Sequence, residues 1–269
     1  MSPGPTGAGP LPAALVPLRA RPAAAAVFCD FDGTLAPIVP DPADARPLPG
    51  VRRLLEALAV TYGLMAVVSG RPAAFLREML GEPAGVRLVG LYGMEEVGGD
   101  GRVVVPEEVA AWRPSVAAVT EQAAAAAPPG MRVESKGLAL TLHWRGHPEL
   151  EGWAEAFAAD QRRRTGLAVQ PGRMAVELRP PVATDKGTVV ARLARGHAAV
   201  AFFGDDLGDL AAFEALDALA AQGVAVARVA VADEETPPSV AAAADVVVEG
   251  PAGALHLLEL LVDQPAPPR

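Results

Sequence analysis

Short apolar runs alternate with amphipathic segments over much of the chain. Continuous apolar runs at residues 24–29, 64–68 and 199–203 predict strands that are buried on both faces, as in a parallel sheet. Residues 49–62 carry apolar side chains at helical spacing and predict a helix between two of these strands. Further strands are predicted at residues 86–90, 103–105, 224–229 and 245–248, and further helices at residues 184–195 and 251–261. Strands that alternate with helices in this way are typical of an α/β fold.

The middle of the chain follows a different pattern. Two largely helical stretches, residues 107–127 and 148–164, are each followed by two segments of alternating polar and apolar residues. Pro114 predicts a kink or restart within the first of these helices. The alternating segments predict strands at residues 131–135, 138–144, 167–170 and 174–178, with a turn at Pro171-Gly172. This order of elements predicts an α+β unit with an antiparallel sheet.

The change of pattern predicts the domain organisation. We expect a cap domain at residues 106–181, inserted into a core that is formed by residues 23–105 and 182–263. Residues 1–22 are rich in proline, glycine and alanine, and we expect a disordered leader there because Arg19 and Arg21 lie too late for a secretory signal. Residues 264–269 include three prolines and predict a disordered tail.

Two carboxylates follow the first apolar run directly. Asp30 and Asp32 are two residues apart, and side chains at that spacing in an extended segment point to the same side. Two unpaired carboxylates at such a short distance repel each other, which costs free energy. Such a pair therefore usually holds a metal ion or divides acid and base roles. The alternative is a polar turn that ends the strand, with Gly33 as an ordinary turn residue.

Polar residues also follow the second apolar run and open a later helix. In Ser69-Gly70-Arg71, a hydroxyl precedes a glycine that lets the backbone approach an anion, and the next helix begins with amides that favour phosphate. Lys186 lies just inside a helix start, where a positive charge opposes the helix dipole, and this hints at a functional role. Serine as a helix cap and a solvated lysine are the alternatives.

An acidic cluster follows the third apolar run. Asp205, Asp206 and Asp209 would bind a hard cation, and carboxylate oxygens suit Mg²⁺, which also keeps waters and a substrate phosphate. Capping of the next helix by aspartate is the alternative. The sequence therefore places acids, a hydroxyl and a lysine at the edge of an α/β sheet where ligands bind.

Composition narrows the classes of partner. The chain has 269 residues, of which 51% are hydrophobic, and these are enough for a sizeable core. Its net charge of −9 argues against nonspecific binding to nucleic acid or to an anionic membrane, and no stretch is long and apolar enough to cross a bilayer. Cys29 is the single cysteine, so no disulfide can form within the chain and a cytoplasmic location is the expectation.

The string Asp-Phe-Asp-Gly-Thr-Leu at residues 30–35 resembles the first motif of the haloacid dehalogenase superfamily. In that superfamily the first Asp is a nucleophile that attacks phosphorus and the second is a general acid/base, here Asp30 and Asp32. Ser69, Lys186 and the acidic cluster then occupy the places of the other three motifs, in the same order. The resemblance implies a Rossmann-like parallel-sheet core with a cap of the second type, because the insert lies between the second and third motifs.

Within the superfamily the chain most resembles trehalose-6-phosphate phosphatases, from about residue 27 to residue 261. The specific stretches are Gly90-Leu91-Tyr92-Gly93-Met94-Glu95, Glu134-Ser135-Lys136, His143-Trp144-Arg145 and Glu177-Leu178-Arg179-Pro180. The resemblance implies that substrate contacts come from Gly70, Arg71, Glu95, Glu134, Lys136, His143, Arg145 and Glu177. A solvated face of the sheet is the alternative for the charged residues on alternating strands.

The resemblance implies a Mg²⁺-dependent phosphatase that hydrolyses trehalose 6-phosphate through an aspartyl-phosphate. Mg²⁺ would be held by Asp30, Asp32 and Asp205, with Asp206 and Asp209 in support, while Ser69 and Lys186 would hold the phosphoryl oxygens. A functional link to a trehalose-phosphate synthase is also implied.

One departure from the family leaves the substrate open. The family's fourth motif usually reads Gly-Asp-Asp-x-Thr-Asp-Glu, whereas Gly208 and Leu210 stand here in place of Thr and Glu. A phosphatase for another sugar phosphate, such as a glucosyl- or mannosyl-glycerate phosphate or sucrose phosphate, is therefore the second hypothesis. A sugar-phosphate-binding module without catalysis is the third.

Overall fold

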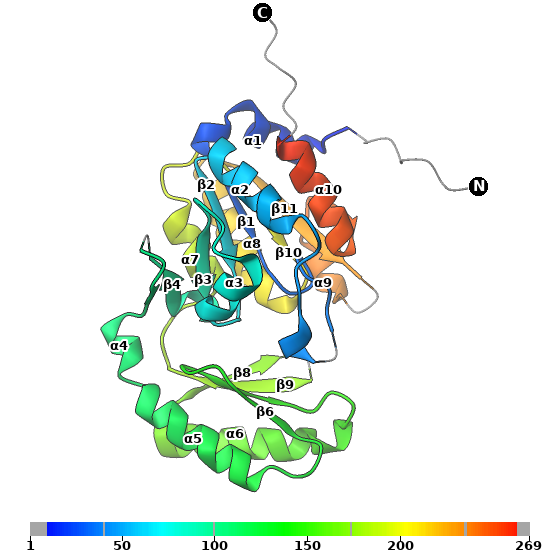
Figure 1. The fold of residues 1–269 in the computed structure, drawn as a ribbon. Helices are drawn as coiled ribbons and strands as arrows, with labels where there is room; N and C mark the ends of the chain where they lie inside the picture. The colour runs from blue at the N-terminus through cyan, green and yellow to red at the C-terminus, as the bar shows by residue number, and fades with distance from the viewer. Residues whose placement is uncertain (1–9, 40, 99, 173, 234–235, 263–269) are drawn as a thin grey trace, which may run out of the picture.

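The computed structural model describes residues 10–39, 41–98, 100–172, 174–233 and 236–262. Within these ranges the chain forms an eight-stranded sheet and a separate four-stranded sheet (Figure 1). The larger sheet has the strand order β12-β11-β10-β1-β2-β3-β4-β5. Its neighbours are parallel from β12 to β3, and the antiparallel strands β4 and β5 extend one edge. This arrangement confirms the predicted α/β class.

Strand β1 (Ala25–Cys29) lies between β10 (Ala199–Gly204) and β2 (Leu64–Val68) and is buried along its whole length. The other strands are β3 (Arg87–Gly90), β4 (Glu95–Val97), β5 (Val103–Val104), β11 (Ala225–Ala232) and β12 (Val246–Glu249). A strand buried on both faces needs apolar side chains at every position. Burial on both faces therefore explains the continuous apolar runs in the sequence.

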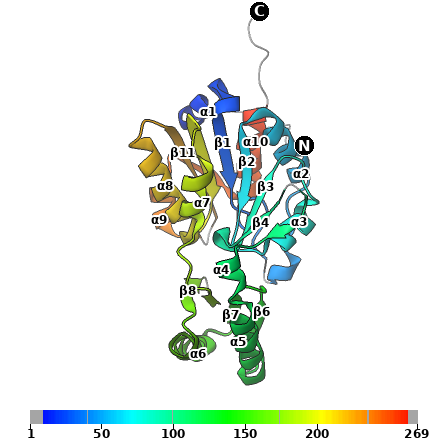
Figure 2. The same cartoon turned by 90° about the vertical axis from the view of Figure 1, so that its left-hand side faces the viewer.

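Helices cover both faces of the larger sheet (Figure 2). One face carries α1 (Val16–Ala20), α2 (Val51–Thr61), α3 (Ala73–Leu80) and α10 (Gly250–Val262). The other face carries α7 (Lys186–Leu193), α8 (Leu210–Ala220) and α9 (Pro238–Ala242). Side chains of β1 alternate between the two cores, with Val27 in the first and Phe28 in the second. The two cores fix β1 in the middle of the fold.

The smaller sheet is antiparallel, with the order β6-β7-β9-β8. Its strands are β6 (Arg132–Ser135), β7 (Leu140–His143), β8 (Ala168–Gly172) and β9 (Ala175–Arg179). Helices α5 (Arg113–Ala126) and α6 (Glu151–Thr165) pack on its apolar face, and the short α4 (Glu107–Ala110) leads into it. Figure 1 shows this inserted unit, α4 to β9, beyond one end of the larger sheet, with α5 and α6 on the far side.

Side-chain alternation gives the smaller sheet one apolar and one polar face. Leu142 and Val176 point into the core beneath α5 and α6. Thr141 and Glu177 are paired across β7 and β9 and point the other way, and Glu134 of β6 pairs with the same Thr141. The polar face therefore lies toward the larger sheet and can contribute groups to a site between them.

The predicted disordered leader is wrong for the part of it that the structure describes. Residues 13–20 form a 3-10 turn followed by α1, and the side chains of Leu15 and Leu18 are fully buried in the first core. Pro17 is tolerated because it lies in the first turn of the helix, where its missing amide hydrogen has no partner to lose. Residues 1–9 and the predicted tail at 264–269 lie outside the described residues.

The two prolines of the inserted unit for which a break was predicted behave differently. The predicted turn at Pro171-Gly172 is wrong, because β8 continues through Gly172 as an edge strand, where proline costs no ladder hydrogen bond. The predicted restart at Pro114 is confirmed, since α4 ends at Ala110 and α5 begins at Arg113. Across the described ranges, every helix is too short or too polar to cross a bilayer.

We expect Leu18→Ala to lower the free energy of unfolding by about 2–5 kcal/mol, the usual cost of emptying a fully buried leucine site. Val16→Ala in the same helix is the matched control, because Val16 is 46% exposed, and its cost should stay within about 0.5 kcal/mol. Urea unfolding of both variants measures the difference. Equal stability of the two variants would mean that α1 does not belong to the core.

Candidate active site

The ends of three neighbouring parallel strands bring the predicted residues together. Asp30 follows β1, Asp205 follows β10 and Ser69 follows β2, and these strands are adjacent in the sheet. The turn after β1 is tight: Gly33 has a φ of 74°, and a Cβ there would lie 2.1 Å from Oδ2 of Asp205. Glycine at this position therefore serves both the left-handed backbone and the close approach of the two loops.

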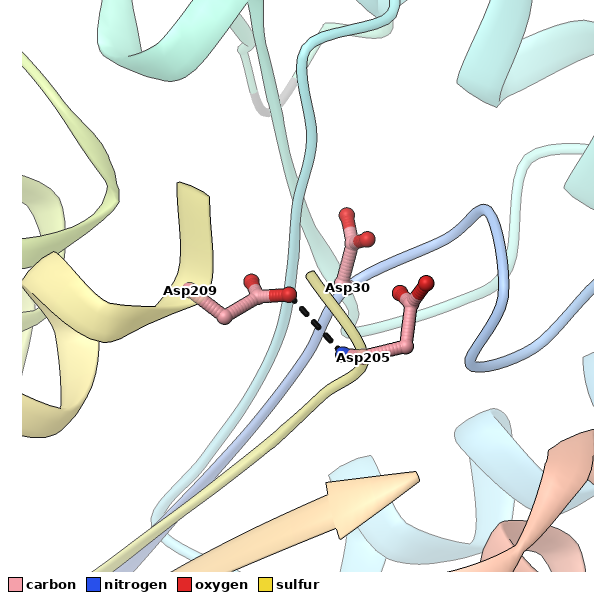
Figure 3. A group of neighbouring side chains, drawn as sticks. All are labelled: Asp30, Asp205 and Asp209. Carbon is pink, nitrogen blue, oxygen red and sulfur yellow. Dashed lines mark hydrogen bonds between the residues drawn. The ribbon is translucent and has the colours of Figure 1, made fainter. Parts of the chain in front are cut away.

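Three carboxylates are buried at this edge of the sheet. Oxygen atoms of Asp30, Asp205 and Asp209 all lie within 4.8 Å of one another (Figure 3). Nζ of Lys186 lies 2.6 Å from Oδ1 of Asp209 and 3.0 Å from Oδ1 of Asp30. One ammonium thus faces three carboxylates, and the group carries an excess of negative charge away from water.

The electrostatics follow from burial. Burial raises the pKa of Asp30 to about 6, with Asp206 and Asp32 adding to the shift and Lys186 opposing it. Burial also raises the pKa of Asp205 and of Asp209 well above the usual value. Burial alone would lower the pKa of Lys186, but the surrounding carboxylates raise it well above its usual range, so the lysine stays charged.

The three acids have different partners. Asp209 is fully engaged, because Oδ1 accepts from Lys186 and Oδ2 accepts from the backbone amides of Asp205 and Asp206. Oδ1 of Asp205 is buried and has no hydrogen-bond partner within the described residues. An unpartnered buried carboxylate oxygen next to Asp30 fits a hard cation that prefers oxygen ligands. The donor set therefore suits Mg²⁺ at Asp30 and Asp205.

Asp206 differs from its neighbours because it is exposed. Its side chain is 57% exposed and lies 4.0 Å from Nζ of Lys186. Its Oδ1 accepts a hydrogen bond from the amide of Gly208 at 2.9 Å, which holds the loop after β10. Asp206 thus lies at the mouth of the group and not within it.

Asp32 is paired with an arginine. Nε and Nη2 of Arg71 each donate to one oxygen of Asp32 at 2.7 Å, a bidentate pair that fixes the carboxylate plane. The amide of Arg71 donates to Oγ of Ser69 at 3.1 Å, and the guanidinium lies 4.6 Å from the centroid of the Phe75 ring. Nη1 of Arg71 also lies 3.9 Å from Glu134 of the inserted unit. Arg71 therefore links the two sheets across the site.

The polar face of the smaller sheet carries one hydrogen-bonded His–Glu pair and one Lys–Glu ion pair. Nε2 of His143 lies 2.7 Å from Oε2 of Glu134, and Nζ of Lys136 lies 2.7 Å from Oε2 of Glu177. Burial would raise the pKa of Glu134, but the hydrogen bond from His143 and the charge of Lys136 lower it to about 2. Glu134 is therefore ionised at neutral pH. Oε1 of Glu177 is buried and has no partner within the described residues.

A cavity of about 260 Å³ lies between the two sheets. Its lining includes the predicted residues Asp32, Arg71, Glu134, Lys136, His143, Arg145, Asp205 and Asp206. A smaller cavity of about 130 Å³ lies deeper, at the strand ends. Its lining includes Asp30, Asp32, Ser69, Gly70, Arg71, Tyr92, Lys136, Lys186, Asp205 and Asp206. The residues that line both cavities connect the strand ends to the polar face of the smaller sheet.

The structure places Glu95 elsewhere. Its Oε2 accepts a hydrogen bond from the amide of Ala73 at 2.8 Å, so the buried carboxylate caps the first turn of α3. Glu95 lines neither cavity, and a capping role replaces the predicted substrate contact. Glu177 also lines neither cavity, but it holds Lys136, which lines both.

Several lining residues had no predicted role. Arg132 lies two residues before Glu134 on the same face of β6, a signal that the strand alternation already contained. Tyr92 belongs to a stretch that the family resemblance singled out, yet no role had been assigned to it. The sequence has only two lysines, Lys136 and Lys186, and both line the deeper cavity. The rarity of lysine in this chain was a second signal that these two residues belong to one site.

The fold and the site together define the class of protein. The chain has a haloacid dehalogenase-like fold: it superposes with a TM-score of 0.58 on a haloacid dehalogenase-like hydrolase from Bacteroides thetaiotaomicron, at 16% identity, covering 88% of this chain and 98% of that one. Within this class, the chain belongs to the trehalose-phosphatase family, whose model matches residues 28–246.

Individual relatives agree with the family. The chain is 33% identical over 249 residues to a trehalose-phosphate phosphatase of Mycobacterium avium, covering 89% of this chain and 62% of the relative. It is 37% identical over 215 residues to that of Mycobacterium marinum, covering 75% and 53%. It resembles the C-terminal domain of C. albicans trehalose-6-phosphate phosphatase with a TM-score of 0.72 and 25% identity, covering 94% and 99%. The chain thus spans little more than half the length of the curated relatives it matches.

We expect Asp205→Asn to stabilise the metal-free protein at neutral pH. Because burial raises the pKa of Asp205 in the folded state, ionisation opposes folding above the unfolded pKa of about 4. The variant should gain on the order of 1 kcal/mol at pH 7, and the gain should vanish below about pH 4, where both states are protonated. Urea unfolding in chelator at the two pH values measures the effect.

Asp160→Asn is the control for this prediction. Asp160 is an exposed residue of α6 that pairs with Arg163 and Arg164, and its replacement should change stability by less than about 0.5 kcal/mol at either pH. A loss of stability in Asp205→Asn at pH 7 would contradict an unpartnered buried charge at this position.

Proposed function

We propose that the protein is a Mg²⁺-dependent phosphatase that hydrolyses trehalose 6-phosphate to trehalose and phosphate. One observation carries the proposal: a buried nucleophile, Asp30, lies at the floor of a cavity whose opposite wall is the ion-paired polar face of the smaller sheet. Family membership and the names of the relatives support this substrate class.

Asp30 attacks the phosphorus and forms an aspartyl-phosphate. Asp32 donates a proton to the leaving sugar oxygen, and it later takes a proton from the water that releases phosphate from Asp30. The bidentate pair with Arg71 holds the carboxylate of Asp32 in one orientation at the boundary of the two cavities, and Arg71 has to release one of the two oxygens before that oxygen can carry the proton.

Mg²⁺ would be held by the carboxylates of Asp30 and Asp205 and by the backbone carbonyl of Asp32. When bound, the ion neutralises negative charge on the phosphoryl group during transfer. Asp206 and Asp209 act in support, and Asp209 does so by fixing Lys186 and the loop after β10. Ser69 and Lys186 hold the phosphoryl oxygens beside the nucleophile, so positioning and charge stabilisation do most of the catalytic work.

The inserted unit acts as the cap domain, with bounds at residues 106–181, and recognises the sugar. A disaccharide presents many hydroxyl groups, and paired acids and bases offer both acceptors and donors to them. Glu134, Lys136, His143 and Arg145 supply these groups, and Glu177 holds the ammonium of Lys136 in place. The core then consists of residues 23–105 and 182–263. A cytoplasmic location and a synthase that supplies the substrate complete the proposal.

A phosphatase for another sugar phosphate remains the second candidate, because Gly208 and Leu210 depart from the family motif. The positions of these two residues nevertheless favour the proposed substrate. Leu210 packs against the second core, and Gly208 lies in the 3-10 turn after β10. Neither residue lines either cavity, so the walls that would contact a sugar are unaffected.

Phosphate release from a panel of sugar phosphates tests the proposal. We expect selectivity for trehalose 6-phosphate, loss of activity with chelator, and a fall in kcat of about three orders of magnitude or more in Asp30→Asn. Asp160→Asn should keep full activity, because that exposed aspartate lies on α6. Activity that prefers another sugar would replace the substrate and keep the mechanism, whereas full turnover by Asp30→Asn would overturn the mechanism.

We expect Lys136→Met to separate sugar recognition from phosphoryl chemistry. The variant keeps a long side chain but loses the ammonium that pairs with Glu177. For trehalose 6-phosphate, kcat/KM should fall about tenfold to a hundredfold. For p-nitrophenyl phosphate, which has no sugar, it should change less than about threefold. Equal losses on the two substrates would place Lys136 in the phosphoryl site instead.

A further inference from the structure

The backbone of Tyr92 adopts a conformation that non-glycine residues rarely take. Tyr92 lies in the 3-10 turn Leu91–Gly93 after β3, with φ of 57° and ψ of 30°, and Leu91 before it also has a positive φ of 47°. Glycine or asparagine would adopt this backbone at lower cost. A tyrosine in such a turn therefore indicates that its side chain has a role that offsets the cost of this backbone conformation.

Hydrogen bonds from two sides fix the turn. The amide of Tyr92 donates to the carbonyl of Ser69 at 3.0 Å, and Oγ1 of Thr184 donates to the carbonyl of Tyr92 at 2.8 Å. Ser69 is the first residue of the loop after β2, and Thr184 lies two residues before Lys186. The turn is thus tied to the loops that carry both groups assigned to the phosphoryl oxygens.

The hydroxyl of Tyr92 lies beside Gly70, and both residues line the deeper cavity. Tyr92 lines that cavity together with Asp30, Ser69 and Lys186. A Cβ at residue 70 would come within 2.5 Å of the hydroxyl oxygen, so Gly70 leaves the space that this hydroxyl occupies. Within the described residues, no backbone or side-chain group hydrogen-bonds to it. Burial raises the pKa of Tyr92, so the hydroxyl is protonated at neutral pH and can donate.

The ring of Tyr92 is held from the side of the smaller sheet. The guanidinium carbon of Arg179, the last residue of β9, lies 5.3 Å from the ring centroid. Arg179 itself donates to Oε1 of Gln170 at 2.7 Å and to the carbonyl of Thr184. The hydroxyl is therefore positioned before any ligand enters, and its position needs no contact with a substrate.

We propose that the Tyr92 hydroxyl donates a hydrogen bond to the phosphoryl group of the substrate, as a third donor beside Ser69 and Lys186. The inference rests on the proposed phosphatase function and adds a substrate-binding residue to it. The phosphoryl group is favoured over the sugar because Tyr92 lines the deeper cavity and not the larger one, which contains His143 and Arg145.

The sequence has two tyrosines, and they provide a matched pair of variants. Tyr92→Phe removes a hydroxyl that has no hydrogen-bond partner among the described residues, whereas Tyr62→Phe removes one that donates to the carbonyl of Leu261 at 3.0 Å, outside both cavities. For Tyr92→Phe we expect kcat/KM to fall about tenfold to a hundredfold on both trehalose 6-phosphate and p-nitrophenyl phosphate. Inhibition by inorganic phosphate should weaken on the same scale, and Tm should not change. Tyr62→Phe should show the reverse, with a lower Tm and unchanged kinetics.

Two results would overturn the inference while leaving the proposed function intact. One is unchanged kinetics in Tyr92→Phe. The other is a loss confined to trehalose 6-phosphate with unchanged inhibition by inorganic phosphate, which would move the contact to the sugar. If the wild-type protein hydrolyses neither ester, the proposed function fails, and calorimetric binding of inorganic phosphate with Mg²⁺ tests the contact. Weaker binding in Tyr92→Phe than in wild type would then support it, and equal or absent binding would overturn it.

Discussion

The site depends on a single buried ammonium that faces an excess of buried carboxylates. Lys186 contacts Asp30 and Asp209, and Asp205 lies in the same group with an oxygen that has no partner in the part of the chain that the structure describes. Charges in this number are costly away from water unless they are paired or hold a metal ion. The parallel sheet makes the arrangement unavoidable, because β1 and β10 are neighbours and each continues directly into an aspartate. The fold therefore concentrates negative charge where a phosphoryl group and a cation can balance one another.

The smaller sheet places polar side chains opposite this group of charges, on the other side of the cavity. Alternation along β6, β7 and β9 turns one face toward α5 and α6 and leaves the other polar. The paired side chains of that polar face hold donors and acceptors in fixed positions at the wall of the cavity, and Arg71 joins them to Asp32. In the proposed function, recognition of the sugar and chemistry on its phosphate fall to different sheets, with Arg71 at their boundary.

Much of this architecture could be predicted because its causes are local. Buried parallel strands require continuous apolar runs, and the polar residues that follow them mark the strand ends. Other features depend on contacts that no local pattern shows. The proline-rich start concealed the burial of Leu15 and Leu18, and an edge position allowed β8 to continue through Pro171. Glu95 resembled a ligand contact, but its carboxylate caps α3. The position of the Tyr92 side chain depends on the space that Gly70 leaves and on the contact of its ring with Arg179, and both residues are distant in sequence.

The central claim is that Asp30 becomes phosphorylated. Rapid acid quenching of the protein with trehalose 6-phosphate and Mg²⁺, followed by mass spectrometry of its peptides, tests this claim most directly. The account predicts a phosphoryl group on the peptide that contains Asp30, and none on the corresponding peptide of Asp30→Asn. Turnover of the substrate with no phosphoryl group on Asp30, or with one on Ser69, would contradict it.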